Sequence, residues 1–460
     1  MSGLSVAIEG CLEYPENKIE KGLLMRRITI IGTGYVGLVS GVGISEFGHH
    51  VICADIDKDK IKKLNSVQMP IYERGLKSLV EQNLAKGRLH FSWDVHKAIQ
   101  DSEIIFIAVG TPQGNNGDPD LSAVESVAKT IGENLNGYKI ICTKSTVPVG
   151  TGKWIEDIIR TIQPNADFDY VSNPEFLREG AAIKDFMHPD RVVIGTRTSK
   201  ALDVMREVYR SFYINETPIL STSVETAEMV KYASNAFLGL KISYINEIAN
   251  LCEEVGSDVH EVARAMGLDG RISPKFLHPG PGFGGSCFPK DMHALAATGR
   301  KNNSVLFTIE AAIKTNVSQK SRMVGKLKRL INDLNGKTVS VLGLAFKPQT
   351  DDVREAASKV VVSELVDSGV IVNAYDPIAI ENFKGHFPDI NYFGSWQGAV
   401  KDADACIILT EWNEFRGIDL DELKTLMKTP IIIDAKNILS MQELESLDFT
   451  YDNVGRGKSE

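Results

Sequence analysis

One cysteine lies in a setting that favours chemistry over structure. Cys287 belongs to the segment PGPGFGGSCFPKD, in which four glycines in six residues precede Ser286, and Pro289 follows two positions after the cysteine. Glycine lets the backbone approach another group closely, and proline suits the first turn of a helix, where its missing N–H costs no hydrogen bond. The segment therefore predicts a bare loop that leads into a helix, with a nucleophilic thiol at the junction.

Three polar residues could assist such a thiol. Lys231 and Asn235 are four residues apart in a stretch of about 30 residues without proline, which predicts one long helix that begins with a capping box from Thr222 to Glu225. Both could donate hydrogen bonds to one oxyanion, although the spacing alone fits a solvated lysine and a surface asparagine better. Asp291 shares a helix face with Cys287 if the helix begins near Phe288, and an acid favoured by the helix dipole explains it equally well.

A glycine-rich turn near the N-terminus predicts a dinucleotide site. The apolar run Ile28 to Ile31 reads as a buried strand, a helical stretch follows the turn, and a second apolar run ends in Asp55. This order of strand, G-x-G-x-x-G, helix and acid is typical of a Rossmann site, in which the acid binds a ribose hydroxyl and favours NAD over NADP. Lys60 lies nearby and weakens that preference. The residues of the turn are Gly32, Gly34, Tyr35, Val36 and Gly37.

A thiol beside a dinucleotide has a specific use. Hydride can leave a tetrahedral carbon that bears an oxyanion but not a free aldehyde, and a thiol adduct restores the tetrahedral carbon. The nucleophile is the thiolate, whose free pKa is about 8.5. A helix N-terminus contributes roughly 0.3–1 kcal/mol, which lowers this pKa by less than one unit. A cation must lower it further, and Lys231 is our candidate.

Strand-like runs alternate with helical patterns in both halves of the chain. The first half contains runs near residues 102–112, 139–148, 168–176 and 191–196, so we expect a parallel sheet with helices on both faces. Thr111, Thr146 and Glu175 stand at strand ends, where ligands bind in such sheets, although turn formation explains each of them too. From Thr338 the pattern returns without the glycine fingerprint, and Lys347 could meet a phosphate there. A purely structural lobe used for dimerisation is the alternative.

Composition excludes several classes of protein. The 460 residues carry a formal net charge of −9, which argues against a nucleic-acid partner. No apolar run approaches the ~18 residues of a membrane span, and the N-terminus does not resemble a secretory signal. The six cysteines form no C-x-x-C pair or zinc-like cluster, so we expect no metal and a cytoplasmic location.

Several motifs in order resemble one family. They are GTGYVGLVSG, VGTP, KSTVPVGT, SNPEFLREG, HPDRVVIG, KYASNAF, FLHPGPGFGGSCFPKD and GLAFKPQTDDVREA. Over residues 26 to about 445 the chain resembles the UDP-glucose/GDP-mannose dehydrogenase family, and within it the enzymes that act on UDP-glucose. The resemblance implies two Rossmann-like, doubly wound parallel-sheet domains joined by a long central helix. It also implies an N-terminal extension (1–25), a NAD-binding domain (26–222), a central dimerisation domain (223–335) and a UDP-sugar-binding domain (336–460).

The resemblance further implies a four-electron oxidation of the C6 alcohol of UDP-glucose to a carboxylate with two NAD, through a thiohemiacetal and a thioester on Cys287. Lys231 and Asn235 would stabilise the oxyanion, Asp291 would orient water with Lys231, and Glu175 would assist thioester hydrolysis with Thr146. NAD would contact the glycine turn, Asp55, Lys60, Thr111, Thr146, Glu179, Lys290 and Arg354. The substrate would contact Glu175, Phe176, Leu177, Arg178, Glu179, Lys231, Asn235, Arg271, Phe276, Leu277, His278, Pro279, Gly280, Gly284 and Lys347. Arg271 would reach the site of a neighbouring subunit in a homodimer.

Three alternative functions remain open from the sequence. The same chemistry could act on GDP-mannose or on a UDP-N-acetylhexosamine. A two-electron β-hydroxyacid dehydrogenase shares a Rossmann half and a helical second part, but Cys287 and the second α/β half argue against it. A nucleotide-sugar sensor without activity would retain the fold, and the set of Cys287, Lys231, Asn235 and Asp291 disfavours it.

Overall fold

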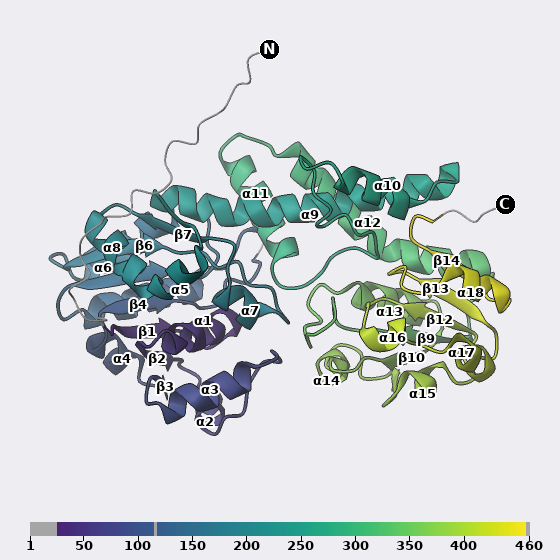
Figure 1. The fold of residues 1–460 in the computed structure, drawn as a ribbon, viewed down its shortest axis with the longest axis horizontal. Coiled ribbons are helices and arrows are strands. Elements are labelled where there is room, and N and C mark those ends of the chain that lie inside the picture. Colours follow the sequence, from purple (N-terminus) through teal and green to yellow (C-terminus); the bar gives the residue numbers. More distant parts are fainter. Residues whose placement is uncertain (1–24, 115–116, 457–460) are drawn as a thin grey trace, which may run out of the picture.

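Two α/β lobes lie at opposite ends of a long helix in the computed structural model, which describes residues 25–114 and 117–456 (Figure 1). The N-terminal lobe precedes this helix in the chain, and the C-terminal lobe follows a small helical part beside it. Cys11 and almost all of the expected extension (1–25) lie outside the described residues.

The N-terminal lobe contains an eight-stranded sheet. Its strand order is β3-β2-β1-β4-β5-β6-β7-β8, with the glycine turn following the central strand β1. The strands are β1 (Arg27–Ile31), β2 (His50–Ala54), β3 (Leu89–Ser92), β4 (Ile104–Ile107), β5 (Lys139–Thr143), β6 (Phe168–Ser172), β7 (Val192–Thr196) and β8 (Ile219–Thr222). Their short, largely apolar runs are mostly buried because helices cover both faces of the sheet, whereas the edge strand β8 is partly exposed.

Alternate residues of each strand contribute to two separate cores. Ile28 and Ile30 belong to the core on one face, whereas Ile31 and Ile105 belong to the core on the other. The helices of the lobe are α1 (Tyr35–Glu46), α2 (Lys58–Asn65), α3 (Leu76–Ala85), α4 (Val95–Asp101), α5 (Ser122–Asn134), α6 (Thr151–Ile162), α7 (Ala182–Met187) and α8 (Ser199–Val208). The doubly wound fold predicted from the sequence is confirmed.

One strand pairing departs from the parallel sheet expected from the sequence. β6 and β7 are antiparallel, with Ser172 opposite Gly195, while the other pairs of this sheet are parallel. The chain leaves β6 at the carboxyl edge, forms a loop and the short helix α7 there, and re-enters the sheet in the opposite direction. Residues 173–191 are therefore held at the edge where doubly wound sheets bind ligands.

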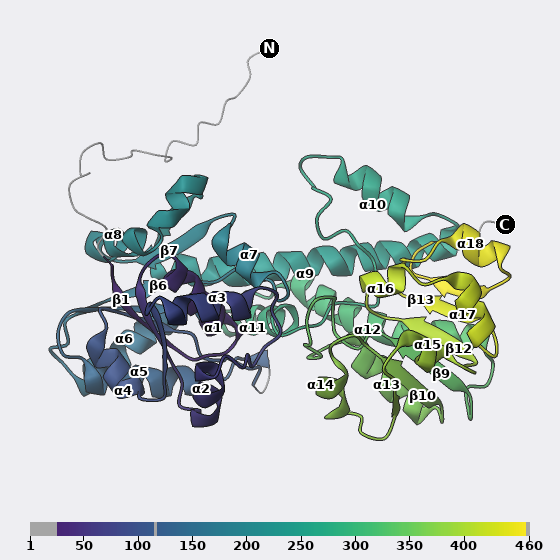
Figure 2. The same cartoon turned by 60° about the horizontal axis from the view of Figure 1, so that its bottom comes forward.

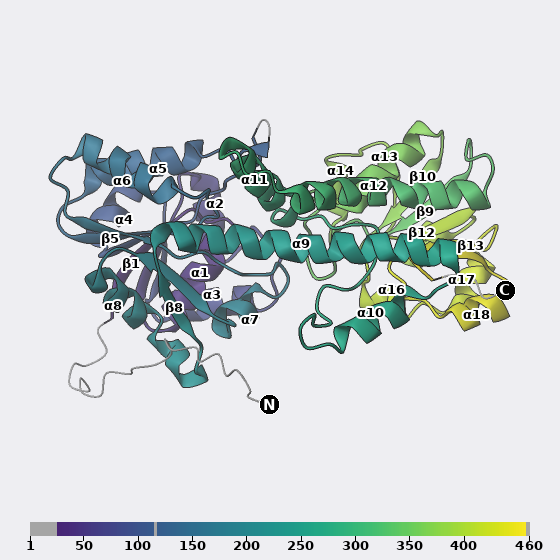
Figure 3. The ribbon, with the colours of Figure 1, turned by 90° about the horizontal axis from the view of Figure 1, so that it is seen from above.

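Helix α9 (Val224–Val255) connects the lobes, and α11 (Phe288–Lys301) and α12 (Phe307–Leu330) lie along it (Figure 3). Its N-cap is Ser223, whose side chain accepts a hydrogen bond from the N–H of Thr226. The predicted capping box from Thr222 to Glu225 is therefore wrong by one position. α10 (Val259–Gly267) lies beside α9 (Figure 2), and its buried Val259 belongs to the same core as Ala249 and Cys252 of α9.

The C-terminal lobe is a second doubly wound domain, whose six strands are all parallel in the order β11-β10-β9-β12-β13-β14. Asp376, which follows β10 as Asp55 follows β2, accepts hydrogen bonds from backbone N–H groups of its own lobe, including that of Leu344 at 2.8 Å. The strands are β9 (Thr338–Leu342), β10 (Ile371–Tyr375), β11 (Asn391–Tyr392), β12 (Ala405–Ile408), β13 (Ile431–Asp434) and β14 (Thr450–Asn453). The helices are α13 (Ala357–Asp367), α14 (Ile380–Lys384), α15 (Trp396–Val400), α16 (Asn413–Arg416), α17 (Leu420–Leu426) and α18 (Met441–Ser446).

Candidate active site

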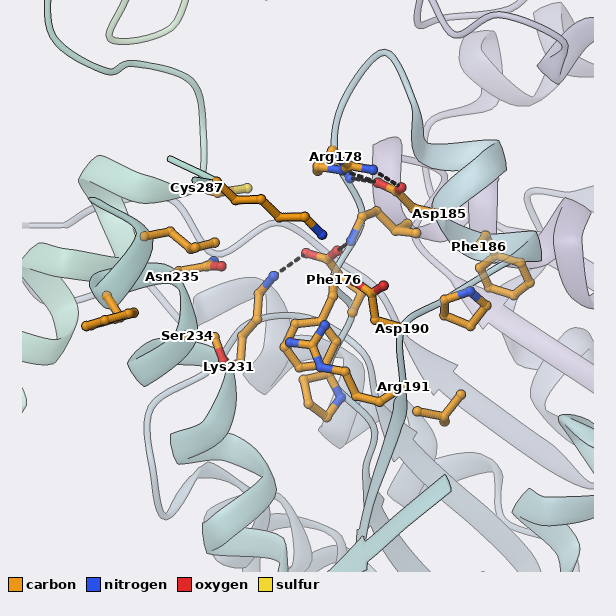
Figure 4. Close-up of a pocket in the computed structure, with 18 of the residues that line it drawn as sticks. Phe176, Arg178, Asp185, Phe186, Asp190, Arg191, Lys231, Ser234, Asn235 and Cys287 are labelled. Atoms are coloured by element: carbon orange, nitrogen blue, oxygen red, sulfur yellow. Dashed lines mark hydrogen bonds and ion pairs between the residues drawn. The ribbon is translucent and has the colours of Figure 1, made fainter. Parts of the chain in front are cut away.

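A cavity of about 700 Å³ lies between the N-terminal lobe, α9 and the start of α11 (Figure 4). Its lining includes several cations, among them Lys144, Lys184, Arg191, Lys241 and Lys275, so the cavity favours an anionic ligand despite the negative net charge of the chain. Eight of the residues predicted from the sequence line it: Glu175, Phe176, Leu177, Arg178, Lys231, Asn235, Phe276 and Cys287.

Lys231 and Glu175 form a buried ion pair in this cavity. Lys231 projects from the first half of α9 and donates to Glu175 Oε1 at 3.0 Å, and the two side chains are only 4% and 5% exposed. The other carboxylate oxygen accepts the N–H of Leu177. Burial opposes the charge of Lys231, but the carboxylates of Glu175 and Asp291 and the Cys287 sulfur outweigh it and raise the pKa of Lys231. Lys231 is therefore a buried cation and not the solvated lysine of the alternative reading.

Asp291 has different partners from those expected. Its Oδ2 accepts from the Asn235 amide at 2.7 Å, and its Oδ1 accepts from the Lys290 ammonium at 2.5 Å. The side chain is 1% exposed, and Lys231 binds Glu175 instead. The four-residue spacing of Lys231 and Asn235 thus places two donors side by side, each with its own carboxylate.

Cys287 is the N-cap residue of α11, at the junction that the sequence predicted. Burial is the main cause that raises the pKa of its thiol from 9.0 to about 11, Glu175 and Asp291 raise it further, and Lys231 lowers it. The expectation that the helix and Lys231 together lower the pKa of this thiol below its ordinary value is wrong, because burial and two carboxylates outweigh them. The resting thiol is protonated at neutral pH.

Glu179 connects Cys287 to the C-terminal lobe. Its Oε1 accepts from the Ser286 hydroxyl at 2.9 Å and from Arg354 Nη2 at 3.3 Å. Ser286 Oγ lies 3.5 Å from Cys287 Sγ. Burial and the neighbouring carboxylate of Asp352 raise the pKa of Glu179 to about 7.

The glycine turn has the shape of a dinucleotide cradle. A side chain at Gly37 would collide with the Gly32 carbonyl, whereas a Cβ at Gly34 would meet nothing within 4 Å, so the backbone there is open to an approaching ligand. Asp55 Oδ2 accepts from Lys60 at 3.0 Å and from the backbone N–H of Thr33 at 2.9 Å. These residues fit NAD: an open turn at a helix N-terminus for its pyrophosphate, and a carboxylate for its ribose.

Other cofactor residues lie at neighbouring strand ends. The Thr111 hydroxyl donates to the Thr146 carbonyl at 2.9 Å, which joins the loops after β4 and β5. This hydrogen bond also stabilises the two turns, which is the structural role that the sequence left open for these threonines. Val36 lies in the first turn of α1, and the Tyr35 hydroxyl binds the buried carboxylate of Glu73.

Most of the remaining substrate residues lie beside the C-terminal lobe, and none of them belongs to the cavity lining. A Cβ at Gly284 would stand 2.4 Å from the carbonyl oxygen of Glu355, so the close approach of these two segments requires glycine. Gly280 donates its N–H to Asn246 at 2.8 Å and faces β13 through Ala435. Leu277, His278 and Pro279 precede it in the same loop. Burial lowers the pKa of Lys347, whose charge faces Glu179 and Cys287. Arg271 binds only Asp269 among the described residues and is 90% exposed.

Profiles of three consecutive domains of one family match this chain. They are described as the NAD binding domain (residues 26–213), the central domain (225–318) and the UDP binding domain (340–441) of the UDP-glucose/GDP-mannose dehydrogenase family. The chain belongs to the UDP-glucose/GDP-mannose dehydrogenase family.

Individual members of the family are similar along almost the whole chain. UDP-glucose 6-dehydrogenase of Rhizobium meliloti is 49% identical over 94% of this chain and 99% of its own length, and UDP-glucose 6-dehydrogenase TuaD of Bacillus subtilis is 49% identical over 94% of each. Among solved structures, a UDP-glucose dehydrogenase from Pyrobaculum islandicum matches with a TM-score of 0.88 at 35% identity, over 93% of this chain and 98% of its own. A UDP-D-ManNAc dehydrogenase from Pyrococcus horikoshii matches with a TM-score of 0.83 at 28% identity, over 94% and 99%.

The motifs of the family also contain residues that spacing and composition do not single out. One of them is Ser286, which belongs to the glycine loop and directly precedes Cys287. Lys144, in the KSTVPVGT motif, is buried and donates to Asn173 at 3.0 Å, and burial lowers its pKa to about 8. Arg191, in HPDRVVIG, stacks on Phe176 at 3.6 Å from the ring centre. In the sequence, only the positions of these three residues inside the family motifs could have indicated that they belong to the site.

No helix in the described part of the chain is long and apolar enough to span a membrane.

Proposed function

We propose that this member of the family is a UDP-glucose 6-dehydrogenase that oxidises the C6 alcohol of UDP-glucose to a carboxylate with two NAD. The observation that carries the proposal is the arrangement of Cys287, Lys231 and Asn235 around one cavity, because this set provides a nucleophile and two donors for an oxyanion. The identity of 49% to two UDP-glucose 6-dehydrogenases favours UDP-glucose over other nucleotide sugars.

The residues of the cavity divide the reaction between them. Lys231 and Asn235 donate hydrogen bonds to the substrate oxygen as it gives up its proton to water and becomes an alkoxide. NAD, when bound, would accept the hydride of each oxidation. Cys287 adds to the resulting aldehyde, which gives a thiohemiacetal that can be oxidised to a thioester. Lys231 is suited to hold the oxyanion because its pKa is raised and it remains a cation at neutral pH.

Hydrolysis of the thioester needs an ordered water and a base. We assign this role to Glu175 with Thr146, and we assign to Asp291 the orientation of Asn235 and Lys290. Lys347, Gly284 and the loop of residues 276–280 are assigned to the UDP-sugar, and Glu179, Lys290 and Arg354 to NAD. The three parts of the chain then have the roles of NAD binding (26–222), dimerisation (223–335) and UDP-sugar binding (336–460).

We also propose that the protein is a homodimer. Phe237, Tyr244 and Leu251 recur every seven residues on α9, and with Val255 they form an exposed apolar stripe on one side of the helix. A second copy of this stripe would bury it and would bring the exposed Arg271 towards a neighbouring site. Light scattering should give a dimer for the wild type and a monomer for Leu251→Asp, and a monomeric wild type would contradict this assignment.

The decisive experiment measures NADH formed per UDP-glucose consumed by the purified protein. Two NADH per sugar are expected, and a ratio of one would indicate a two-electron dehydrogenase. A panel containing GDP-mannose and UDP-N-acetylhexosamines tests the substrate, since a higher kcat/KM on one of them would replace UDP-glucose. Cys287→Ser should retain the fold and lose the second oxidation. A cytoplasmic location follows from this substrate and is also a proposal.

A further inference from the structure

The cavity contains a nucleophile that is protonated and lacks an obvious base. Because the pKa of the Cys287 thiol is about 11, fewer than about one thiol in a thousand is ionised at neutral pH. In the described part of the chain, the thiol contacts neither Glu175 nor Asp291 by a hydrogen bond, and its one such contact is with Ser286. The oxygens of Glu175 bind Lys231 and the N–H of Leu177, and those of Asp291 bind Asn235 and Lys290.

A continuous chain of polar atoms leads from the thiol to a third carboxylate. Cys287 Sγ lies 3.5 Å from Ser286 Oγ, and either atom can donate in that contact. Ser286 Oγ donates to Glu179 Oε1 at 2.9 Å. Glu179 has one further oxygen, Oε2, which is buried and receives no hydrogen bond from a cation among the described residues, while the Asp352 carboxyl lies within hydrogen-bonding reach of Glu179. One carboxylate oxygen is therefore not committed to any cation.

We propose that Ser286 and Glu179 form a proton relay that takes the proton of Cys287 when the thiol adds to the aldehyde and returns it when the thioester is hydrolysed. This inference rests on the proposed function of the same cavity. Glu179 and Ser286 act through Cys287 and need no contact with the reacting carbon.

The relay balances in both directions. As the S–C bond forms, the Cys287 proton moves to Ser286 Oγ, the Ser286 proton moves to Glu179 Oε1, and the aldehyde oxygen becomes an alkoxide held by Lys231. In the thiohemiacetal, the Ser286 hydroxyl donates a hydrogen bond to the Cys287 sulfur, and the protonated carboxyl of Glu179 donates to Ser286 Oγ. When water has attacked the thioester, the S–C bond breaks and the same two protons move back, so that the thiol is regenerated.

The charges around Glu179 suit a group that both accepts and gives up a proton. Burial and the Asp352 carboxyl disfavour the ionised carboxylate, while Arg354, Lys347 and the Ser286 hydroxyl favour it. The result is a pKa of about 7, near the value at which an acid–base group works best in both directions at neutral pH. The charged groups that face Cys287 are Glu175, Lys231 and Asp291 on the side of the cavity, and Lys347 and Arg354 on the side of the C-terminal lobe.

The test isolates the second oxidation by supplying the 6-aldehyde of UDP-glucose with NAD and measuring single-turnover NADH formation against pH. The wild-type rate should rise through a step near pH 7, as Glu179 ionises, and then reach a plateau. In Ser286→Ala the step should disappear, and the rate near neutral pH should fall on the order of 100-fold or more. Ser286→Thr retains the hydroxyl and should restore the step. Ser340→Ala, which removes a buried serine hydroxyl of β9 far from the cavity, should behave as wild type.

A second measurement needs neither cofactor nor substrate. Alkylation of Cys287 by iodoacetamide, followed by peptide mass spectrometry, should be about three- to tenfold slower in Ser286→Ala below pH 9, because the thiolate loses one hydrogen-bond donor. A wild-type profile without the step near pH 7, or Ser286→Ala with an unchanged profile, would overturn the relay. In contrast, a wild type that oxidises neither UDP-glucose nor its aldehyde would overturn the proposed function itself.

Discussion

Replacing Glu175 with glutamine should have opposite effects on the reactivity of Cys287 and on turnover. Glutamine keeps the shape of the side chain and removes its charge. The pKa of the Cys287 thiol is raised from 9.0 to about 11, which corresponds to about 2.7 kcal/mol against the thiolate. Burial is the first cause and the Glu175 carboxylate the second, so we assign on the order of 1 kcal/mol to Glu175.

Removing this charge should therefore make Cys287 about fivefold more reactive towards iodoacetamide at pH values below 9. Lys231 favours the same outcome, because it loses its partner at 3.0 Å and still faces the sulfur as a cation. Steady-state turnover of UDP-glucose should instead fall, since thioester hydrolysis loses its base. The thioester should then accumulate, and intact-protein mass spectrometry would detect it.

The assay measures the pseudo-first-order alkylation rate of Cys287 in cofactor-free protein over a series of pH values. Asp185→Asn is the matched control, because Asp185 lines the same cavity, pairs with Arg178 and does not contribute to the pKa of Cys287. Slower alkylation in Glu175→Gln would refute the reasoning, because it would mean that Glu175 acts chiefly by keeping Lys231 charged.

Three further predictions concern the cofactor site, the joint between the lobes and the dependence of stability on pH. Asp55→Ala should weaken NAD binding about 10- to 100-fold by calorimetry, because a charged hydrogen-bond acceptor is lost, and equal affinity would remove Asp55 from the site. Lys326→Met should lower the free energy of unfolding, measured with urea, by about 3–5 kcal/mol. The reason is that the fully buried Lys326 ammonium pairs with Glu253 at 2.8 Å and with Asp452 at 3.1 Å. An unchanged midpoint of the urea transition would show that these ion pairs do not stabilise the fold. Burial raises the pKa of Glu228 from 4.5 to about 7, so its contribution to stability is fully present below pH 4.5 and is lost as pH rises to about 7. Glu228→Gln should lack this loss when unfolding is measured across that range.

The elements that carry the site could be predicted because their signals are local. The apolar run before Gly32, the proline-free stretch around Lys231 and the glycine loop before Cys287 each specify a strand, a helix or a turn through neighbouring residues. The antiparallel direction of β7 could not be predicted in this way, because it depends on where residues 173–191 pack and not on the residues of the strand.

The partners within the site were harder to predict for the same reason. Helical spacing places Lys231 and Asn235 on one face, but Glu175 and Asp291 are each 56 residues away in the chain, and no periodicity relates them. The acidity of Cys287 was predicted in the wrong direction, because a helix N-terminus and a cation are visible in the sequence while burial is not. The role of Ser286 depends on one contact with Glu179, which is 107 residues away.

Each of the three carboxylates near Cys287 is paired with a cation from a different part of the chain. The site therefore needs α9, α11 and the C-terminal lobe together. Glu175 binds Lys231 of α9, and Asp291 binds Lys290 of α11. Glu179 alone receives its cation, Arg354, from the C-terminal lobe. If that lobe moves away, Glu179 loses Arg354, but it also loses Asp352 and part of its burial, which together outweigh Arg354. Its pKa then falls from about 7 towards the ordinary value of a glutamate. Glu179 is then ionised at neutral pH but is a weaker base, so it takes the proton of Cys287 less readily. Contact between the lobes would therefore control not only the binding of the sugar nucleotide but also the reactivity of the thiol.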